Sequence, residues 1–340
     1  MAQVRVAVDA MGGDNAPLEI VKGAVDAING NKDIFVYLVG VKSAIEDALK
    51  GLEYDASQLE IVDAPEVIAT DDPPVISIRK KKNSSIVIGQ TLVKEGKADG
   101  FVSSGSTGAV LVGAQLIVGR LKGVDRPPLA PLIPTKKGFS LLLDCGANVD
   151  ARPSHLLQFA KLGSIYMEYC CGVKNPTVGI LNIGAEEEKG NLLVKETFPL
   201  LKACPDINFV GSVEARDVPY GGVDVIVCEA FAGNVFIKTF EGTGGLLLGE
   251  IKSVLKSSPI TMIGAALIKS ALKKTLKKYD AHEYGGAPML GLNGLVVKSH
   301  GSAKAKEICT SINQCVTFSQ QKINDKIKEK INFGGIENGV

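Results

Sequence analysis

The chain has 340 residues, which suits one large α/β domain of two lobes that share a cleft. Its composition, with 45% hydrophobic and 22% charged residues, is that of an ordinary globular protein. A net charge of +1 argues against a surface built for nucleic acid, and no apolar run reaches the roughly 18 residues of a membrane-spanning helix.

Short β-branched runs alternate with helical patterns along the chain. We expect strands at residues 4–10, 34–40, 59–64, 100–104, 139–146, 177–184, 207–213, 223–230 and 294–300. Helical patterns lie between them, for example at 153–171 and 191–202, and a long one covers 302–331 before a tail that we expect to fray. This alternation predicts a doubly wound, mostly parallel sheet in α/β/α layers.

Glycine-rich segments follow several of these strands. They are MGGDNAP, SSGSTGA, DCGANVD, NIGAEEEKGN and EAFAGNV. Ligands of doubly wound sheets bind beyond the carboxyl ends of the strands. We therefore expect these segments to be loops around a single large cleft that spans the 1–340 catalytic domain.

The segment SSGSTGA has the character of an anion-binding loop. Its small residues allow backbone N–H groups and the hydroxyls of Ser104, Ser106 and Thr107 to converge where a helix begins. A serine cap on a tight turn is an equally good explanation of this loop taken alone.

Three further residues at strand ends are candidates for catalysis. Lys189 lies in a glycine-flanked acidic segment, Asn234 in EAFAGNV, and His300 directly after an apolar strand. A solvated charge cluster or a structural histidine would account for the same patterns.

Residues 259–279 form a basic amphipathic helix that we expect to protrude. Its apolar positions include Ile260, Ile263 and Leu267, and the second half carries Lys273, Lys274 and Lys277. Such a helix can lie on an anionic membrane, or it can pack on the core or on a second subunit. The run RKKK at 79–82 could likewise attract an acidic partner, although a solvated helix face is its usual explanation.

Several cofactor and catalytic motifs are absent from the sequence. It has no Walker A segment, no GxGxxG turn, no GxSxG elbow and no HExxH, and it has only three histidines. The seven cysteines are odd in number and form no CxxC pair, so we expect reduced, buried thiols in a cytoplasmic protein. We therefore expect neither a metal nor a nicotinamide cofactor.

One family combines these motifs in the same order. From about residue 4 to residue 330, segments such as VAVDAMGGDNAP, SSGSTGA, LLDCGANVD, NIGAEEEKGN, CEAFAGNVFIKTFEG and KSHGS resemble the PlsX phosphate acyltransferases of bacterial phospholipid synthesis. The chain departs from that pattern in DRPPLA, where alanine is more usual at one proline, and in SSGSTGA, which replaces a form with Ala and Asn.

The resemblance implies a reaction and a set of partners. Acyl-[acyl carrier protein] and inorganic phosphate would give acyl phosphate, which passes to a membrane glycerol-3-phosphate acyltransferase. The implied enzyme is a homodimer on the cytoplasmic membrane surface, needs no cofactor, and has a fold similar to isopropylmalate and isocitrate dehydrogenases.

The enzyme of such a reaction has to hold phosphate in line with a thioester carbonyl and stabilise the oxyanion, and this requirement leads to a hypothesis for the roles of the candidate residues. Ser104, Gly105, Ser106, Thr107 and Gly108 would hold phosphate, and Lys189 would neutralise charge on phosphate or on the oxyanion. Asn234 and His300 would orient phosphate or protonate the leaving thiolate.

Three other functions remain open at this stage. They are a phosphotransacylase that uses acyl-CoA, a hydroxy-acid dehydrogenase with metal and NAD, and a membrane-recruited scaffold that binds the carrier protein without turnover.

Overall fold

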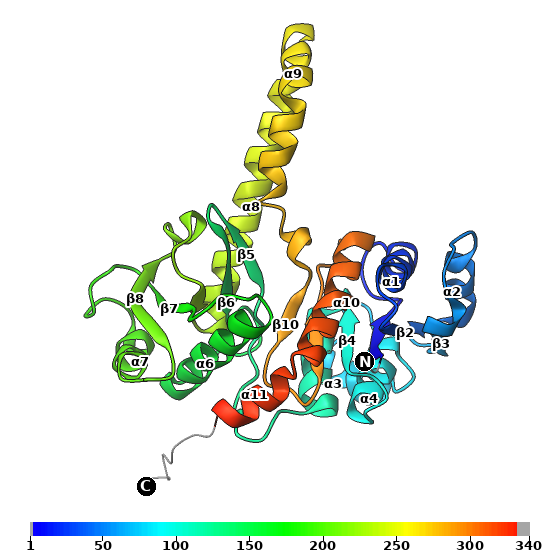
Figure 1. The fold of residues 1–340 in the computed structure, drawn as a ribbon, viewed down its shortest axis with the longest axis horizontal. Helices are drawn as coiled ribbons and strands as arrows, with labels where there is room; N and C mark the ends of the chain where they lie inside the picture. The colour runs from blue at the N-terminus through cyan, green and yellow to red at the C-terminus, as the bar shows by residue number, and fades with distance from the viewer. Residues whose placement is uncertain (1–2, 332–340) are drawn as a thin grey trace. The chain divides into compact units, whose positions relative to one another are not determined.

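The computed structural model describes residues 3–331, so the expected fraying of the tail from Asn332 lies outside the described residues (Figure 1). The chain forms two compact units. Unit 1 comprises residues 1–131, 161–176 and 282–340, and unit 2 comprises residues 132–160 and 177–281.

Unit 1 contains a six-stranded sheet in the order β10-β11-β4-β1-β2-β3. Its strands are β1 (Val4–Asp9), β2 (Ile34–Gly40), β3 (Leu59–Asp63), β4 (Gly100–Ser103), β10 (Ala287–Met289) and β11 (Leu295–Lys298). Neighbouring strands are parallel except for the antiparallel pair β10 and β11.

Helices cover this sheet because its central strands are apolar on both faces. Five of the six residues of β1 are buried, and both α10 and α4 contact that strand. The helices of unit 1 are α1 (Leu18–Gly30), α2 (Lys42–Leu49), α3 (Pro74–Lys80), α4 (Ser85–Lys94), α5 (Thr107–Gly113), α10 (Ala305–Gln320) and α11 (Ile323–Lys330).

Unit 2 has a five-stranded sheet in the order β5-β6-β9-β7-β8. The strands are β5 (Leu132–Thr135), β6 (Gly138–Leu143), β7 (Thr177–Asn182), β8 (Asn208–Glu214) and β9 (Val225–Val227), all parallel to their neighbours except β5. Its helices are α7 (Leu192–Lys202), α8 (Ala230–Leu255) and α9 (Pro259–Lys277), whereas α6 (Pro153–Tyr169) begins in unit 2 and ends in unit 1.

These two sheets confirm the predicted α/β class with mainly parallel strands. The long helical pattern at 302–331, however, divides into α10 and α11. Lys322 interrupts it with a left-handed backbone, at a φ of 51°.

The segment EAFAGNV is a helix start, and our prediction of a strand-end loop there is wrong. Glu229 accepts hydrogen bonds from the backbone N–H groups of Phe231 and Ala232, and α8 begins directly behind β9. A glutamate is an uncommon N-cap, and a glycine follows it within the same segment, so the sequence pattern indicated a loop rather than the start of a helix.

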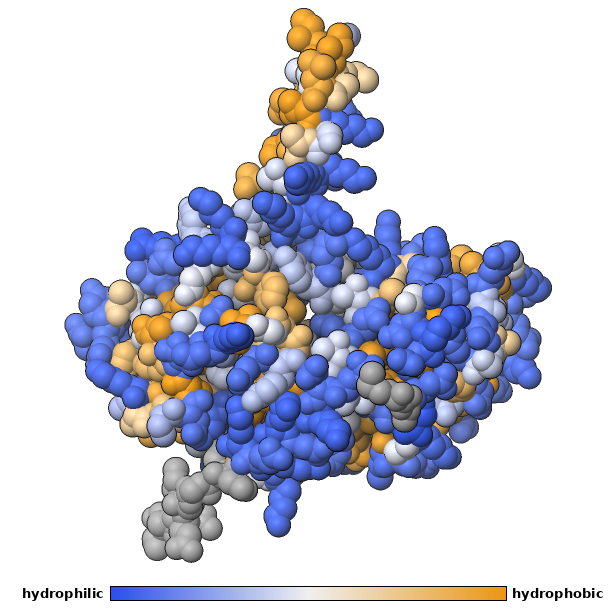
Figure 2. All heavy atoms as spheres, viewed as in Figure 1, coloured by the Kyte–Doolittle hydropathy of each residue, from blue (hydrophilic) through white to orange (hydrophobic). Residues whose placement is uncertain are grey.

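Helices α8 and α9 form a hairpin that projects from the sheet of unit 2 (Figure 1). No residue of α9 is buried, and Figure 2 shows hydrophobic atoms at the outer end of the hairpin. The exposed apolar side chains of that outer part are Leu246, Leu247, Ile251, Val254, Ile260, Met262, Ile263 and Leu267. Lys273, Lys274 and Lys277 follow toward the base of α9.

Within residues 3–331, no single helix is long and apolar enough to cross a membrane. The pair α8 and α9, bent by 120°, passes that test only when the two helices are combined, and only by length and composition.

Candidate active site

The carboxyl ends of three adjacent parallel strands of unit 1 lie close together. Strands β1, β4 and β11 are neighbours, and hydrogen bonds connect the loops that follow them. Ser299 donates its N–H to the carbonyl of Ser103 at 2.9 Å, and Asp14 donates its N–H to the carbonyl of Gly301 at 2.7 Å. The site of unit 1 is therefore assembled from segments near residues 9–14, 103–108 and 299–302.

A buried carboxylate organises this strand edge. Asp9 is 1% exposed and accepts hydrogen bonds from Ser103 Oγ at 2.6 Å and from the N–H of Met11 at 3.1 Å. Ser103 Oγ in turn accepts the N–H of Gly105 at 3.0 Å. Burial raises the pKa of Asp9 above its ordinary value, although bonds from Ser103 and Ser85 and the charge of Lys298 oppose that shift.

The first glycine turn packs directly on this network. A Cβ at Gly12 would lie 2.4 Å from Asp9 Oδ2 and 2.5 Å from the backbone N of Gly105. Gly13 has a φ of +98°, and a Cβ there would lie 2.8 Å from Ser104 Cβ. Both positions accept only glycine without displacement of the neighbouring loop.

The predicted phosphate residues differ in what remains available to a ligand. Ser104 is 2% exposed, and its hydroxyl has no hydrogen-bond partner among the described residues. Gly105 already donates its N–H to Ser103, and Ser106 caps α5 by accepting from Ala109. Ser104 is the strongest candidate ligand of this loop because a buried, unpaired hydroxyl is unfavourable until a ligand pairs with it.

The last two residues of the loop have different surroundings. Thr107 is exposed at the first position of α5, where backbone N–H groups have no acceptor within the helix. At Gly108 an added Cβ would lie 2.5 Å from Pro74 Cγ, so α3 contacts the predicted phosphate loop, Ser104–Gly108, at that residue.

His300 lies on the same edge of the unit 1 sheet as the phosphate loop. Its side chain is exposed, and Nδ1 is 2.8 Å from Ser302 Oγ. Its backbone N–H donates to Glu307 Oε1 at 2.7 Å, and the preceding Ser299 bonds Ser103. The structure thus brings His300 and the phosphate loop together within unit 1.

Lys189 belongs to unit 2, in the loop after β7. Asn182, the last residue of β7, donates to the carbonyl of Lys189 at 3.2 Å and so fixes its backbone. The nearby Glu187 is paired with Lys202 at 2.7 Å. The side chain of Lys189 is exposed to solvent.

Asn234 also belongs to unit 2, in the second turn of α8. Its side-chain amide donates to the carbonyl of Cys145 at 3.1 Å. The helix approaches this loop closely, since a Cβ at Gly233 would lie 2.0 Å from the carbonyl oxygen of Asp144. Burial raises the pKa of the Cys145 thiol well above its ordinary value, which disfavours the thiolate that a nucleophile needs.

Asp9 and Ser103 are site residues that the motif analysis missed. A signal for Asp9 was present in the sequence, because an aspartate at the end of an apolar strand, followed by Ala-Met-Gly-Gly, is expected to be buried with its strand. The seven cysteines are all free, but the expectation that they are buried holds only for Cys145, Cys228 and Cys315, and the other four are partly exposed. The described residues contain no group of three or more His, Cys, Asp or Glu that could hold a metal ion.

The sequence matches one family model over residues 4–326, described as a fatty acid synthesis protein. A phosphate acyltransferase of Clostridium tetani is 47% identical over 328 residues, covering 96% of this chain and 98% of the relative. A phosphate acyltransferase of Clostridium acetobutylicum is 48% identical over 326 residues, with the same coverage.

Solved structures share the fold at lower identity. The EutD phosphotransacetylase of Staphylococcus aureus matches with a TM-score of 0.61 and 19% identity over 94% of both chains. A branched-chain phosphotransacylase of Enterococcus faecalis matches with a TM-score of 0.53 and 15% identity over 93% of this chain and 98% of its own. A putative 4-hydroxythreonine-4-phosphate dehydrogenase of Salmonella typhimurium gives a TM-score of 0.51 at 10% identity, over 93% of this chain and 99% of its own.

Proposed function

This chain belongs to the fatty acid synthesis protein family and is a phosphate acyltransferase, and we propose that its acyl donor is an acyl-[acyl carrier protein]. The strongest support is the similarity to phosphate acyltransferases over 96% of the chain. The product, acyl phosphate, would serve phosphatidic acid synthesis through a membrane glycerol-3-phosphate acyltransferase.

The reaction needs no nucleophile from the protein. An oxygen of inorganic phosphate attacks the thioester carbonyl carbon, a C–O bond forms, and the C–S bond breaks. The electron pair leaves with the carrier thiolate, which then takes up a proton. The enzyme has to hold phosphate in line with the carbonyl and stabilise the oxyanion that develops there.

The phosphate loop, Ser104–Gly108, is the proposed anion site of unit 1. Ser104 would donate its buried hydroxyl, and the first amides of α5 would add N–H donors. Gly105 would contribute the shape of the loop, because its N–H is engaged by Ser103. Ser106 and Gly108 would hold the turn and the contact to α3.

Of the two roles left open for Asn234 and His300, we propose one for each. Lys189 would neutralise charge on phosphate or on the oxyanion, and Asn234 would orient phosphate. His300, with Nδ1 directed at Ser302, would protonate the leaving thiolate through its other ring nitrogen.

Two surfaces suit the proposed partners. Arg79, Lys80 and Lys82 are exposed and would attract an acidic carrier protein. The apolar outer part of the α8–α9 hairpin, followed by lysines toward its base, would enter an anionic membrane surface as a peripheral anchor. A homodimer is proposed on the family resemblance alone.

The decisive experiment measures phosphate-dependent release of carrier thiol from a long-chain acyl-[acyl carrier protein], beside the matching acyl-CoA. Release from the carrier substrate that disappears without phosphate is the expected result. Release from acyl-CoA alone would make the protein a phosphotransacylase. Binding of the carrier without any release would leave only the scaffold.

The hairpin is tested by flotation with vesicles containing anionic lipid. We expect Leu267→Asp to reduce vesicle binding by about tenfold or more, since a carboxylate at an apolar contact is expensive to desolvate. Thr275→Asp, on the same helix but outside the apolar outer part, adds the same charge as a control. Equal binding of both variants would contradict this role for the apolar outer part.

A further inference from the structure

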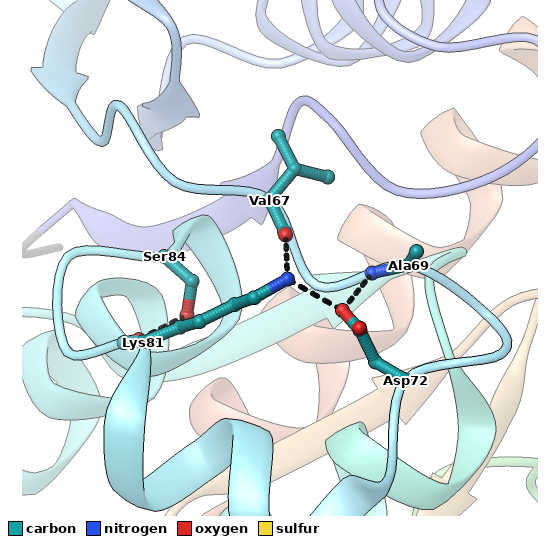
Figure 3. A network of polar contacts seen from close by, with 5 residues as sticks. All are labelled: Val67, Ala69, Asp72, Lys81 and Ser84. Atoms are coloured by element: carbon teal, nitrogen blue, oxygen red, sulfur yellow. Dashed lines mark hydrogen bonds and ion pairs between the residues drawn. The ribbon is translucent and has the colours of Figure 1, made fainter.

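The four basic residues at 79–82 do not share one environment. Arg79, Lys80 and Lys82 are exposed, whereas Lys81 is half-buried and turned inward (Figure 3). Lys81 Nζ donates to Asp72 Oδ2 at 2.6 Å and to the carbonyl of Val67 at 2.9 Å. One residue of a basic run that the sequence pattern predicts to be solvated therefore makes contacts within the protein.

Asp72 connects Lys81 to the turn of residues 69–72. The same Oδ2 atom accepts the N–H of Ala69 at 2.8 Å, so the turn of residues 69–72 ends on the carboxylate that binds Lys81 (Figure 3). Helix α3 starts two residues after Asp72 and ends one residue before Lys81. The Lys81–Asp72 pair therefore joins the two ends of α3.

This segment contacts the phosphate loop at one end and is connected to it indirectly at the other. At its first residue, Pro74 packs on Gly108, where a Cβ would lie 2.5 Å away. Beyond its last residue, Ser84 Oγ donates to the carbonyl of Lys81 at 2.8 Å, and α4, which begins at the next residue, Ser85, packs on β1, the strand that ends in Asp9. Asp9 supports the loop through Ser103.

We propose that Lys81 is a positioning residue for phosphate: by joining Val67 and Asp72 to the end of α3, it fixes Pro74 against Gly108 and so sets the geometry of the phosphate loop. The inference rests on the proposed function. Lys81 itself would not contact phosphate, because its Nζ already donates to the carbonyl oxygen of Val67 and to Asp72 Oδ2.

A positioning role and a charge-attraction role predict opposite effects at Asp72. If Lys81 merely attracted anions, removal of the neighbouring carboxylate would strengthen phosphate binding. If the pair positions the loop, Asp72→Ala weakens phosphate binding as Lys81→Met does, and the two changes are not additive, because either one alone breaks the contact. Lys50→Met breaks a lysine–aspartate pair of the same 2.6 Å length, with Asp47, that is exposed on α2, and it is the matched control.

The test is the KM for inorganic phosphate in thiol release by the full-length chain. We expect Lys81→Met, Asp72→Ala and the double variant each to raise this KM about tenfold, with kcat changed less. The KM of Lys50→Met should stay within about twofold of wild type. Lys81→Arg, which keeps charge and donors, should restore part of the loss. An unchanged or lower KM in Asp72→Ala refutes the proposal, even if Lys81→Met does not fold.

Hydrogen exchange separates this inference from the proposed function. If the wild type shows no thiol release, inorganic phosphate is added alone and the protection of amides 103–109 is measured. Protection that is present in the wild type and reduced in Asp72→Ala supports the positioning role without any acyl transfer. Equal protection in both proteins, or protection in neither, overturns it.

Discussion

Replacement of Gly12 by alanine should disturb the strand edge that carries the phosphate loop. The new Cβ would lie 2.4 Å from Asp9 Oδ2, 2.5 Å from Gly105 N and 2.9 Å from Gly105 Cα. The carboxylate could rotate away, but the backbone of Gly105 has to move by roughly 1 Å to reach ordinary contact distance. That movement separates Gly105 from Ser103, whose hydroxyl bridges it to Asp9.

The expected loss of stability has two sources. Overpacking of a closed site costs about 1–3 kcal/mol, and a buried hydrogen bond left unmade costs about 1–3 kcal/mol more. We therefore expect Gly12→Ala to lower the free energy of unfolding of unit 1 by about 2–6 kcal/mol. The KM for phosphate should rise as well, because Ser104 is bonded to Gly105 in the chain and would be displaced with it.

Gly30 provides the matched control for this substitution. It lies at the end of α1, and a Cβ added there would have no other atom within 4 Å, so Gly30→Ala should be neutral or stabilising by up to about 1 kcal/mol. Urea unfolding followed by far-ultraviolet circular dichroism compares the two, since the chain has no tryptophan. If Gly12→Ala unfolds at the same urea concentration as Gly30→Ala, the close packing argued here is wrong.

Three further substitutions test the site. Ser104→Ala should leave stability unchanged or slightly higher, since it removes an unpaired buried hydroxyl, while the KM for phosphate rises about tenfold. Lys189→Ala should lower turnover roughly 10²-fold, and near wild-type rates would remove it from the mechanism. Burial raises the pKa of Asp9 above its ordinary value of 3.8, so the folded state binds a proton at this carboxyl more tightly than the unfolded state does. Wild-type stability should therefore fall as the pH rises from 3.8 through the higher pKa of the folded state. Asp9→Asn lacks that loss, so urea unfolding between pH 4 and pH 8 should show the variant gaining stability relative to wild type as pH rises.

The sequence predicted the sheet-forming segments well because buried parallel strands have a simple signature. β9 is a continuous apolar run, β1 is apolar apart from Arg5 and its last residue, Asp9, and both lie within the segments that the pattern predicted. The start of α8 was mispredicted, since Gly233 looks like a loop residue in the sequence. The structure shows its reason, because only glycine lets the helix approach the carbonyl of Asp144.

Side-chain partners could not be predicted from the sequence. The run RKKK looks uniform, yet Lys81 differs from Lys80 because a loop nine residues earlier supplies Asp72 as its partner. The pairing of Asp9 with Ser103 joins residues 94 positions apart. Such contacts depend on strand order, here β1 beside β4, which local pattern does not specify.

Paired and unpaired polar groups on the unit 1 strand edge explain why the ligand site should lie there. Asp9 has several partners, so it shapes the edge and needs no ligand. Five buried side-chain atoms of residues 3–331 have no partner, and two of them are hydroxyls, those of Ser104 and Ser164. Ser164 lies within helix α6, where a hydroxyl has a backbone carbonyl within reach after a rotation. Ser104 instead directly follows a strand, and the neighbouring glycine turn packs closely against it. An anion that enters there gains a donor that folding has already desolvated, which is the preorganisation that acyl transfer to phosphate requires.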